Sequence, residues 1–282
     1  EHTYAGFGHV RTVSQLSDAS QPDRAGQVDI HGRDRRDRRM SRPLWIIGDV
    51  HASTSTDADL FRLLNAATAK RVDLLFMGDL FVAWLGPERF WSNTTRPLLQ
   101  ALRRCRREGL RIYFVQGNRD YLTAGLADDV FDEVWTEPGL RTIGGRPTWV
   151  LHGDGIDSRD RAYRAWRTLT RGPWANALLH RLPAAWGRKL PAWTARRLQN
   201  TNRAFKRGDL PTAAFEAVAR DARRAGAKHC LMGHFHVAAD FTFDEVEIRI
   251  VPGWPETRSL LVARDDRWQV QSLEDVVRPV AT

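Results

Sequence analysis

The stretch Leu44-Trp45-Ile46-Ile47-Gly48-Asp49-Val50-His51 decides how this chain folds. Its apolar run Leu44–Ile47 is typical of a buried strand, and two polar side chains, Asp49 and His51, follow directly where the strand ends. Four later stretches share this pattern of an apolar run followed by Asp, Asn or His: Gly78-Asp79, Gly117-Asn118-Arg119-Asp120, His152-Gly153-Asp154 and Gly233-His234-Phe235-His236. Side chains that follow the strands of an α/β sheet gather at one edge of that sheet. The sequence therefore predicts one polar site built from five loops.

Strands alternate with helices along most of the chain, which predicts an α/β layered fold. The expected strands are Leu44–Ile47, Val72–Met77, Arg111–Val115, Thr148–Leu151 and Cys230–Met232. The expected helices are Leu60–Ala69, Arg96–Glu108 and Ala213–Ala225. The pattern then changes, because Phe241–Val251 alternates in part and two further strand candidates follow, Ser259–Ala263 and Trp268–Leu273. The later strands indicate a mixed sheet or a sandwich with an antiparallel part.

Two segments stand apart from this core, which we expect to comprise residues 43–156 and 208–282. Residues 1–42 have no hydrophobic periodicity and contain a charged run from His31 to Arg39, so we expect a disordered basic tail. It is either an upstream extension, with Met40 as the natural start, or a functional arm. Residues 157–207 hold 13 Lys or Arg against two Asp, together with four Trp and three Pro. We expect them to form a helical cap insertion that projects over the site.

Composition narrows the function classes. The chain of 282 residues has a net charge of +9, and the excess of positive charge lies mainly in residues 157–207, which indicates a local anionic partner such as an anionic membrane surface. No apolar run approaches the roughly 20 residues that span a bilayer, and no secretory signal is visible. Cys105 and Cys230 are expected to be free thiols, as in a reducing compartment. We therefore expect a cytoplasmic protein, peripheral at the inner face of the membrane.

The polar residues of the five loops are metal ligands by type, because they combine carboxylates, an amide oxygen and imidazoles. That mixture suits Mn, Fe or Zn, and neither cysteine is placed to make a thiolate site. Two ions about 3.5–4 Å apart can hold a hydroxide and clamp a phosphate during attack and departure. No Gly-x-Ser-x-Gly elbow and no Walker-type phosphate loop is present, so no protein nucleophile is expected.

The combination and order of the five motifs resemble the calcineurin-like metallophosphoesterases. The resemblance implies a layered metallophosphoesterase core, in which a mixed β-sandwich is flanked by helices, and two divalent metal ions, with Mn foremost. It implies that the first ion is held by Asp49, His51, Asp79 and His236. It implies that the second ion is held by Asp79, Asn118, His152 and His234, so that Asp79 bridges the two.

Arg119 narrows the range of substrates that we expect. Many members of the family have His at this position, where it can protonate a leaving oxygen, but Arg stays charged and instead grips phosphate through two N–H donors. A phosphate leaving group needs less protonation, so Arg119 favours cleavage of a diphosphate bond. Its alternative role is that of a structural salt-bridge partner. We expect Asn118, Arg119 and Asp120 to form the catalytic triplet.

A narrower resemblance covers about residues 43–262. The stretch Gly78–Gly86, the triplet and the stretch Asp160–Trp174 look like the UDP-2,3-diacylglucosamine diphosphatases of the lipid A pathway. This implies hydrolysis of UDP-2,3-diacylglucosamine to 2,3-diacylglucosamine 1-phosphate and UMP. Val82 and Phe235 depart from the family's pattern. The candidate substrate contacts are Arg119, Tyr163, Arg164, Arg196, Arg197, Arg203 and Lys206.

Three alternatives stay open at this point. The chain acts on another nucleotide diphosphate or phosphodiester, or it is a nuclease whose basic aromatic segment binds single strands, or it is a non-enzymatic membrane-binding module. Nucleic acid is not the partner we expect, because the positive charge lies in a cap-like insertion rather than along an evident groove. The sequence gives no prediction of the oligomeric state.

Overall fold

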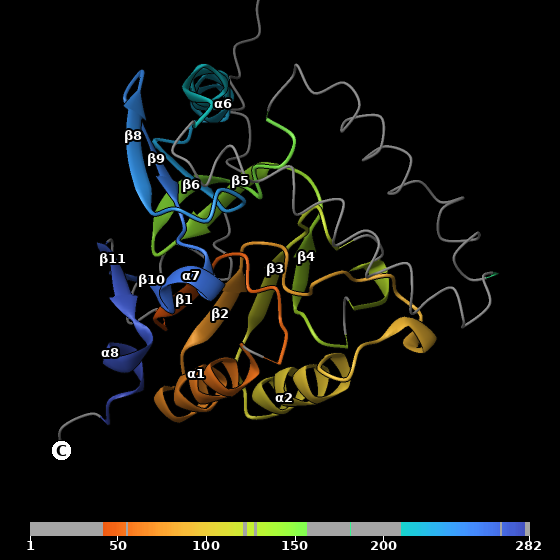
Figure 1. Ribbon diagram of the computed structural model, residues 1–282. Coiled ribbons are helices and arrows are strands. Elements are labelled where there is room, and N and C mark those ends of the chain that lie inside the picture. The colour runs from red at the N-terminus through yellow and green to blue at the C-terminus, as the bar shows by residue number, and fades with distance from the viewer. Residues whose placement is uncertain are drawn as a thin grey trace, which may run out of the picture.

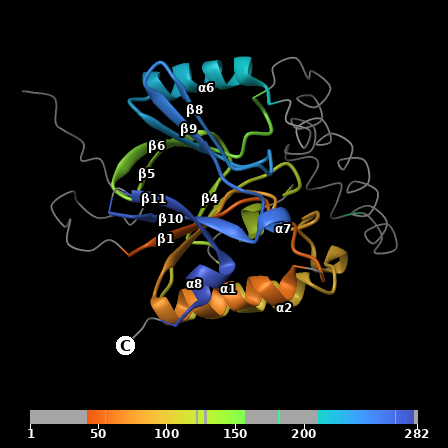
Figure 2. The ribbon, with the colours of Figure 1, turned by 60° about the vertical axis from the view of Figure 1, so that its left-hand side comes forward.

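The protein is built in four layers, with two β-sheets packed face to face and helices on both outer faces (Figures 1 and 2). The computed structural model describes residues 42–54, 56–120, 123–126, 129–156, 181, 210–265 and 267–279. The predicted α/β class, with a mixed β-sandwich flanked by helices, is confirmed. The tail, apart from residue 42, and the expected cap at 157–207, apart from Arg181, lie outside the described residues. The division into tail, core and cap therefore stays a prediction.

The first sheet has six strands in the order β11-β10-β1-β2-β3-β4. The strands from β1 to β4, which is the edge strand, run parallel to one another. β10 pairs antiparallel with β1, and β11 pairs antiparallel with β10. The bounds are β1 (Leu44–Ile47), β2 (Asp73–Phe76), β3 (Ile112–Val115), β4 (Glu133–Trp135), β10 (Ser259–Arg264) and β11 (Arg267–Ser272). The carboxyl ends of β1, β2 and β3 therefore meet at one edge.

The second sheet has five strands in the order β5-β6-β7-β9-β8. β6, β7 and β9 run parallel, and β5 and β8 pair antiparallel at the two edges. The bounds are β5 (Gly139–Ile143), β6 (Arg146–Leu151), β7 (His229–Met232), β8 (Ala239–Phe243) and β9 (Val246–Ile250). This mixture of parallel and antiparallel pairs matches the change of pattern seen in the later part of the sequence.

Helices cover both outer faces (Figure 2). The first sheet is covered by α1 (Asp57–Lys70), α2 (Thr95–Arg107) and α8 (Leu273–Val277), and the second by α6 (Thr212–Arg224). Three shorter elements lie in the connections, namely η1 (Glu88–Phe90), η2 (Thr123–Leu126) and α7 (Trp254–Thr257). No helix in the described ranges is long and apolar enough to cross a membrane.

Strand periodicity explains the layering, because successive side chains of a strand point to opposite faces. In β1, Ile46 contributes to the core between the two sheets, whereas Ile47 contributes to the core under the helices. In β7, Leu231 lies between the sheets, whereas Met232 packs in the cluster that includes α6. These strands bury both faces, which is why they appear in the sequence as continuous apolar runs rather than alternating ones.

The structure differs from the sequence prediction at several elements. Phe241–Val251 is a hairpin of β8 and β9 rather than one strand, because Asp244 and Glu245 form its turn with φ of 47° and 66°. Two-residue hairpin turns require such positive φ values, which usually bring Gly into the sequence. β4 and β5 were not predicted, and Leu273 begins α8 rather than ending a strand. The prediction of free cysteines is confirmed, and both thiols are buried.

Candidate metal centre

The five predicted loops meet at one place between the two sheets. Asp49 and His51 follow β1, Asp79 follows β2, and Asn118 follows β3, so the first sheet supplies four of the seven predicted ligands. The second sheet supplies His152 after β6, and the loop after β7 supplies His234 and His236. All seven predicted ligands come from strand ends, and every one of them contacts at least one other member of the set. The site thus lies where the carboxyl ends of both sheets converge.

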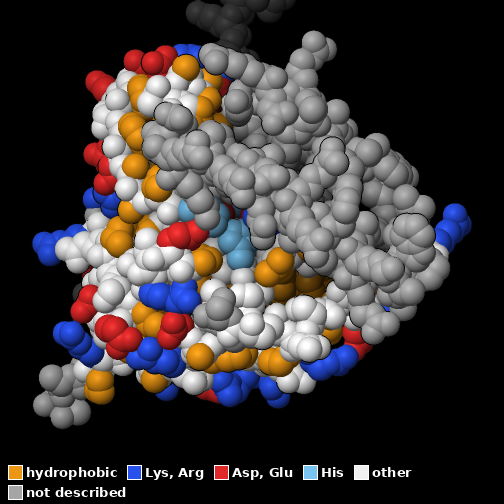
Figure 3. Space-filling model, viewed as in Figure 1, with side chains coloured by type: hydrophobic (Ala, Val, Ile, Leu, Met, Phe, Trp, Pro, Cys, Tyr) orange, Lys and Arg blue, Asp and Glu red, His pale blue; other side chains and the backbone are white. Residues whose placement is uncertain are grey.

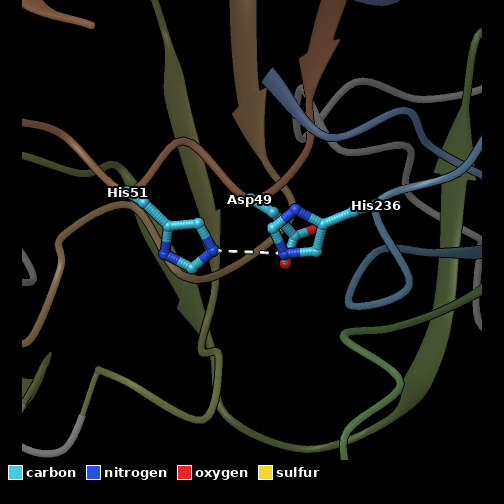
Figure 4. A group of neighbouring side chains, drawn as sticks. All are labelled: Asp49, His51 and His236. Carbon is cyan, nitrogen blue, oxygen red and sulfur yellow. Dashed lines mark hydrogen bonds and ion pairs between the residues drawn. The ribbon is translucent and has the colours of Figure 1, made fainter. Parts of the chain in front are cut away.

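One group of side chains is formed by Asp49, His51 and His236 (Figure 4). Nε2 of His51 lies 3.2 Å from Nε2 of His236, and the two rings are stacked with their centroids 5.1 Å apart. Oδ1 of Asp49 lies 3.9 Å from Nε2 of His236. Two imidazole nitrogens and a carboxylate oxygen thus converge on one small volume, as the ligands of a divalent cation do.

A second group is formed around His152 by Asp49 and Asp79. Nε2 of His152 lies 4.0 Å from Oδ1 of Asp49 and 3.8 Å from Oδ1 of Asp79. Oδ1 of Asn118 lies 3.2 Å from the same nitrogen, and the ring of His234 meets the ring of His152 edge-on, with centroids 5.2 Å apart. The sequence prediction placed these residues together, and the structure brings them together.

Asp79 reaches both groups, because its two carboxylate oxygens point to different histidines. Oδ2 lies 3.9 Å from Nε2 of His51, and Oδ1 lies 3.8 Å from Nε2 of His152. Asp49 also belongs to both groups. Two buried carboxylates therefore stand between two pairs of imidazoles.

The backbone is strained at the site. Among the ten non-glycine residues with positive φ in the described ranges, five are members of the predicted ligand set, with φ between 44° and 73°: Asp49, His51, Asp79, His234 and His236. Non-glycine residues rarely adopt this region, and each such residue costs about 1–3 kcal/mol unless its surroundings enforce it. Such strain is typical of functional sites, where the required direction of a side chain outweighs the cost of an unfavourable backbone conformation.

Hydrogen bonds between the loops enforce this strained backbone. The N–H of His51 donates to the carbonyl of Asp79 at 2.9 Å, and the N–H of His234 donates to Oδ2 of Asp49 at 2.8 Å. Oδ2 of Asp120 accepts from the N–H groups of Asp79 and Gly117, at 2.7 and 3.0 Å. Asp120 is fully buried, so its carboxylate joins the loops after β2 and β3 from within. The loops after β1, β2, β3 and β7 consequently hold one another in position.

Two histidines have a defined proton position. Nδ1 of His152 lies 2.7 Å from the carbonyl of Met77, and a carbonyl can only accept, so Nδ1 donates. Nδ1 of His236 lies 2.9 Å from Oε2 of Glu256 and donates in the same way when the carboxylate is ionised. In the neutral form of each ring the lone pair is therefore on Nε2 and faces the carboxylates, as in metal-ligating histidines. Sequence reasoning missed Glu256, since it lies in α7, away from every motif.

Burial sets the protonation of several groups. Burial lowers the pKa of His51, and the nearby charge of Arg119 lowers it further. Burial, followed by the neighbouring His152, lowers the pKa of His234 to about 4. Both imidazoles are consequently neutral at pH 7, which is the form that binds metals.

The balance of burial and nearby charge raises the pKa of three further groups. Burial raises the pKa of Asp49, against the attraction of His236 and His152. Burial and the charge of Asp79 raise the pKa of Asp120 to about 7. Burial opposes the charged form of His152, but the carboxylates of Asp79 and Asp49 outweigh it and raise its pKa. Negative charge is thus crowded where little water can stabilise it, an arrangement that a cation would relieve.

The residues present fit a divalent cation. Oδ1 of Asp49 is buried, accepts no hydrogen bond, and faces Nε2 of two histidines at about 4 Å. A buried carboxylate oxygen without a partner is costly unless a cation or a donor satisfies it. Histidine side chains are visible at the centre of the face in Figure 3, and the side chain of His51 is 12% exposed.

Comparison of the sequence with known families agrees with this geometry. Residues 42–238 match the model of a family described as calcineurin-like phosphoesterase. The chain belongs to this family. Its members are metal-dependent phosphoesterases, and the ligand-type groups around Asp49 fit the use of divalent metal by this chain.

Curated relatives cover most of the phosphoesterase chain. It is 29% identical over 249 residues to a protein of Pseudomonas syringae pv. tomato named UDP-2,3-diacylglucosamine hydrolase, and the match covers 84% of this chain and 98% of that one. It is 31% identical over 233 residues to a protein of the same name from Chromohalobacter salexigens, covering 78% and 92%. A solved archaeal phosphodiesterase covers 81% of this chain and 98% of its own, with 11% identity and a TM-score of 0.42.

The remaining predicted residues of the phosphoesterase site fall into two sets. Arg119 is 8% exposed, and its Nε lies 3.4 Å from Oδ2 of Asp79, while its backbone N–H donates to Oδ1 of Asp79 at 2.8 Å. The ion pair that the sequence left open as an alternative is thus present. The other expected substrate contacts lie outside the described residues: Tyr163, Arg164, Arg196, Arg197, Arg203 and Lys206.

Proposed function

We propose that this chain hydrolyses the diphosphate bond of UDP-2,3-diacylglucosamine, with water adding across P–O–P to give UMP and 2,3-diacylglucosamine 1-phosphate. The observation that carries the proposal is the position of Asp79, whose two carboxylate oxygens face His51 and His152 with Arg119 beside them. The names of the curated relatives, matched over almost their whole length, support this substrate.

We assign the ligands of two divalent ions, with Mn foremost, to the residues that the motifs predicted. Asp49, His51, Asp79 and His236 hold the first ion, and Asp79, Asn118, His152 and His234 hold the second. Divalent ions supply Lewis acidity there, lowering the charge on a phosphate and favouring ionisation of water. The donor set of carboxylate, amide and imidazole suits Mn, with Fe and Zn as the other candidates.

The chain's own groups supply position and charge. Arg119 has N–H donors that can hold a phosphate oxygen, and it remains charged throughout, so it stabilises the phosphate that leaves. Asn118 is 8% exposed and presents a neutral amide oxygen next to His152. Asp120 touches backbone N–H groups rather than the open side of the site, so we assign it a positioning role within the catalytic triplet.

A cavity beside His152 gives the substrate an apolar wall. Its volume is about 240 Å³, and it lies between the loop after β4, the loop after β6 and α6. Trp135, Trp149, Ile156 and Val218 are among its lining residues. A substrate that joins a diphosphate to acyl chains needs apolar surface next to its phosphates, and this cavity adjoins the metal centre through His152.

The direct test is metal-dependent release of UMP from UDP-2,3-diacylglucosamine, with bis-p-nitrophenyl phosphate as a general phosphodiester. We expect Mn-dependent turnover of the lipid, its loss in Asp79→Ala, and its retention in Asp265→Ala, which removes an exposed carboxylate paired with Arg264. Turnover of bis-p-nitrophenyl phosphate without turnover of the lipid would keep a phosphoesterase centre and refute the lipid substrate.

The positive charge of residues 157–207 leads to a second part of the proposal, which is peripheral association with an anionic membrane at its cytoplasmic face. Lys and Arg near a surface of anionic lipids each contribute about 1 kcal/mol of attraction. The chain should sediment with vesicles that contain anionic lipid and remain in the supernatant with neutral ones. Equal pelleting with both kinds of vesicle would contradict an electrostatic attachment.

A further inference from the structure

Glu256 contacts the metal centre from outside the five loops. Its Oε2 lies 2.9 Å from Nδ1 of His236, which is 7% exposed. An ionised carboxylate can only accept, so Nδ1 carries the proton and Nε2 keeps its lone pair. That lone pair faces His51 at 3.2 Å and Asp49 at 3.9 Å, the place where the geometry concentrates ligand atoms.

The helix that carries Glu256 is fixed in the core. Trp254 begins α7 with a fully buried side chain, and its N–H donates at 2.9 Å to the carbonyl of Gly48, next to Asp49. Arg258 closes the other end, where its Nη1 donates to the carbonyls of Trp254 and Pro255 at 2.9 and 2.8 Å. Nε of Arg258 also binds Oδ2 of Asp59 in α1 at 2.8 Å. Glu256 is therefore presented by a rigid support.

The backbone leaves room for this contact. A Cβ atom on Gly253 would lie 2.7 Å from Oε2 of Glu256 and 2.9 Å from Nδ1 of His236. Heavy atoms do not approach so closely, so any other residue at position 253 would push the carboxylate and the imidazole apart. Gly253, which precedes α7, thus allows Glu256, within α7, to lie close to His236.

We propose that Glu256 is a positioning residue that holds His236 in the Nε2-ligating tautomer and strengthens its binding of a divalent cation. This rests on the metal centre of the proposed function and adds a residue that no motif supplied. A carboxylate on the far nitrogen fixes the ring and makes the near nitrogen more basic, and loss of such a partner weakens metal binding about 10–100-fold.

The two facing imidazoles make this tautomer necessary. Nε2 of His51 and Nε2 of His236 are only 3.2 Å apart, so a proton on either one can form a hydrogen bond to the other. Such a bond would occupy both lone pairs that a cation needs. Glu256 removes this alternative on the side of His236, because it retains the proton on Nδ1.

The test is Mn²⁺ affinity, measured by titration calorimetry on the full chain without substrate, together with the melting temperature of the metal-free protein. Glu256→Ala should weaken binding by about 10–100-fold. Glu256→Gln should weaken it less, because an amide oxygen still accepts from Nδ1 but carries no charge. The matched control is Glu247→Ala, which removes a carboxylate from Nδ1 of His229 at 3.2 Å, outside the centre, and should leave affinity unchanged.

Each outcome is decisive. Wild-type affinity in both folded Glu256 variants, or an equal loss in Glu247→Ala, would overturn the assignment. Absence of Mn²⁺ binding by the wild type would overturn it together with the metal centre. Normal Mn²⁺ binding by the wild type without lipid hydrolysis would refute the proposed substrate and leave the role of Glu256 standing.

Discussion

Replacement of Gly78 by Ala tests whether the loop after β2 fixes His152. Gly78 has φ of +95°, and a Cβ atom there would lie 2.3 Å from Nδ1 of His152. The change costs about 1–3 kcal/mol of backbone strain. It also forces His152 away from the carbonyl of Met77, which it binds at 2.7 Å, and an unsatisfied buried partner costs about 1–3 kcal/mol more. We expect Gly78→Ala to lower the free energy of unfolding by about 2–6 kcal/mol.

Gly109→Ala is the matched control, since Gly109 has φ of +89° but nothing within 4 Å of the added Cβ. Gly109→Ala introduces the backbone strain without a collision. Urea unfolding of both metal-free variants should therefore show a difference of about 1–3 kcal/mol in unfolding free energy, which is the contribution of the collision with His152. Mn²⁺ titration should show weakened binding in Gly78→Ala and wild-type binding in Gly109→Ala. Equal stability of the two variants together with equal Mn²⁺ affinity would refute the placement of His152.

Two further predictions concern the carboxylates. Asp120→Ala removes the acceptor of two buried N–H groups, those of Asp79 and Gly117, and should lower the free energy of unfolding in urea by about 2–6 kcal/mol. Asp120→Asn keeps an oxygen at this place and should lower it clearly less. Equal losses in the two variants would contradict this role of Asp120. Mn²⁺ should raise the melting temperature more at pH 8 than at pH 5.5. The pKa values of Asp49 and His152 are both raised, so their protons stabilise the metal-free fold at low pH, and that contribution is lost as the pH rises through the raised values. Calorimetry that shows a larger shift at pH 5.5 would count against them as ligands.

The site was predictable because its residues follow strands that are buried on both faces. Leu44–Ile47 and Cys230–Met232 are short apolar runs, and such runs followed by Gly and a polar residue mark the strand ends of an α/β fold. The five motifs contain all seven ligand candidates, the resemblance to the metallophosphoesterases implied their role, and the structure brings all of them together. The sequence also indicated free cysteines, which the structure confirms.

Other features depend on contacts that no local pattern carries. β4 has only three residues and a single buried one, Trp135, so it lacks a detectable period. The turn between β8 and β9 uses Asp244 and Glu245 where Gly is usual, so the hairpin resembled one strand. Glu256 meets His236 only because α7 is fixed against β1, a tertiary contact between distant segments.

We propose that the five loops form one two-ion centre with Asp79 between the ions. The most direct test is a crystal structure of the Mn²⁺-loaded chain with anomalous scattering recorded at the manganese edge. We expect two anomalous peaks about 3.5–4 Å apart, with one oxygen of Asp79 directed at each. A single peak, or two peaks of which one lies away from Asp79, would contradict a two-ion centre around this carboxylate.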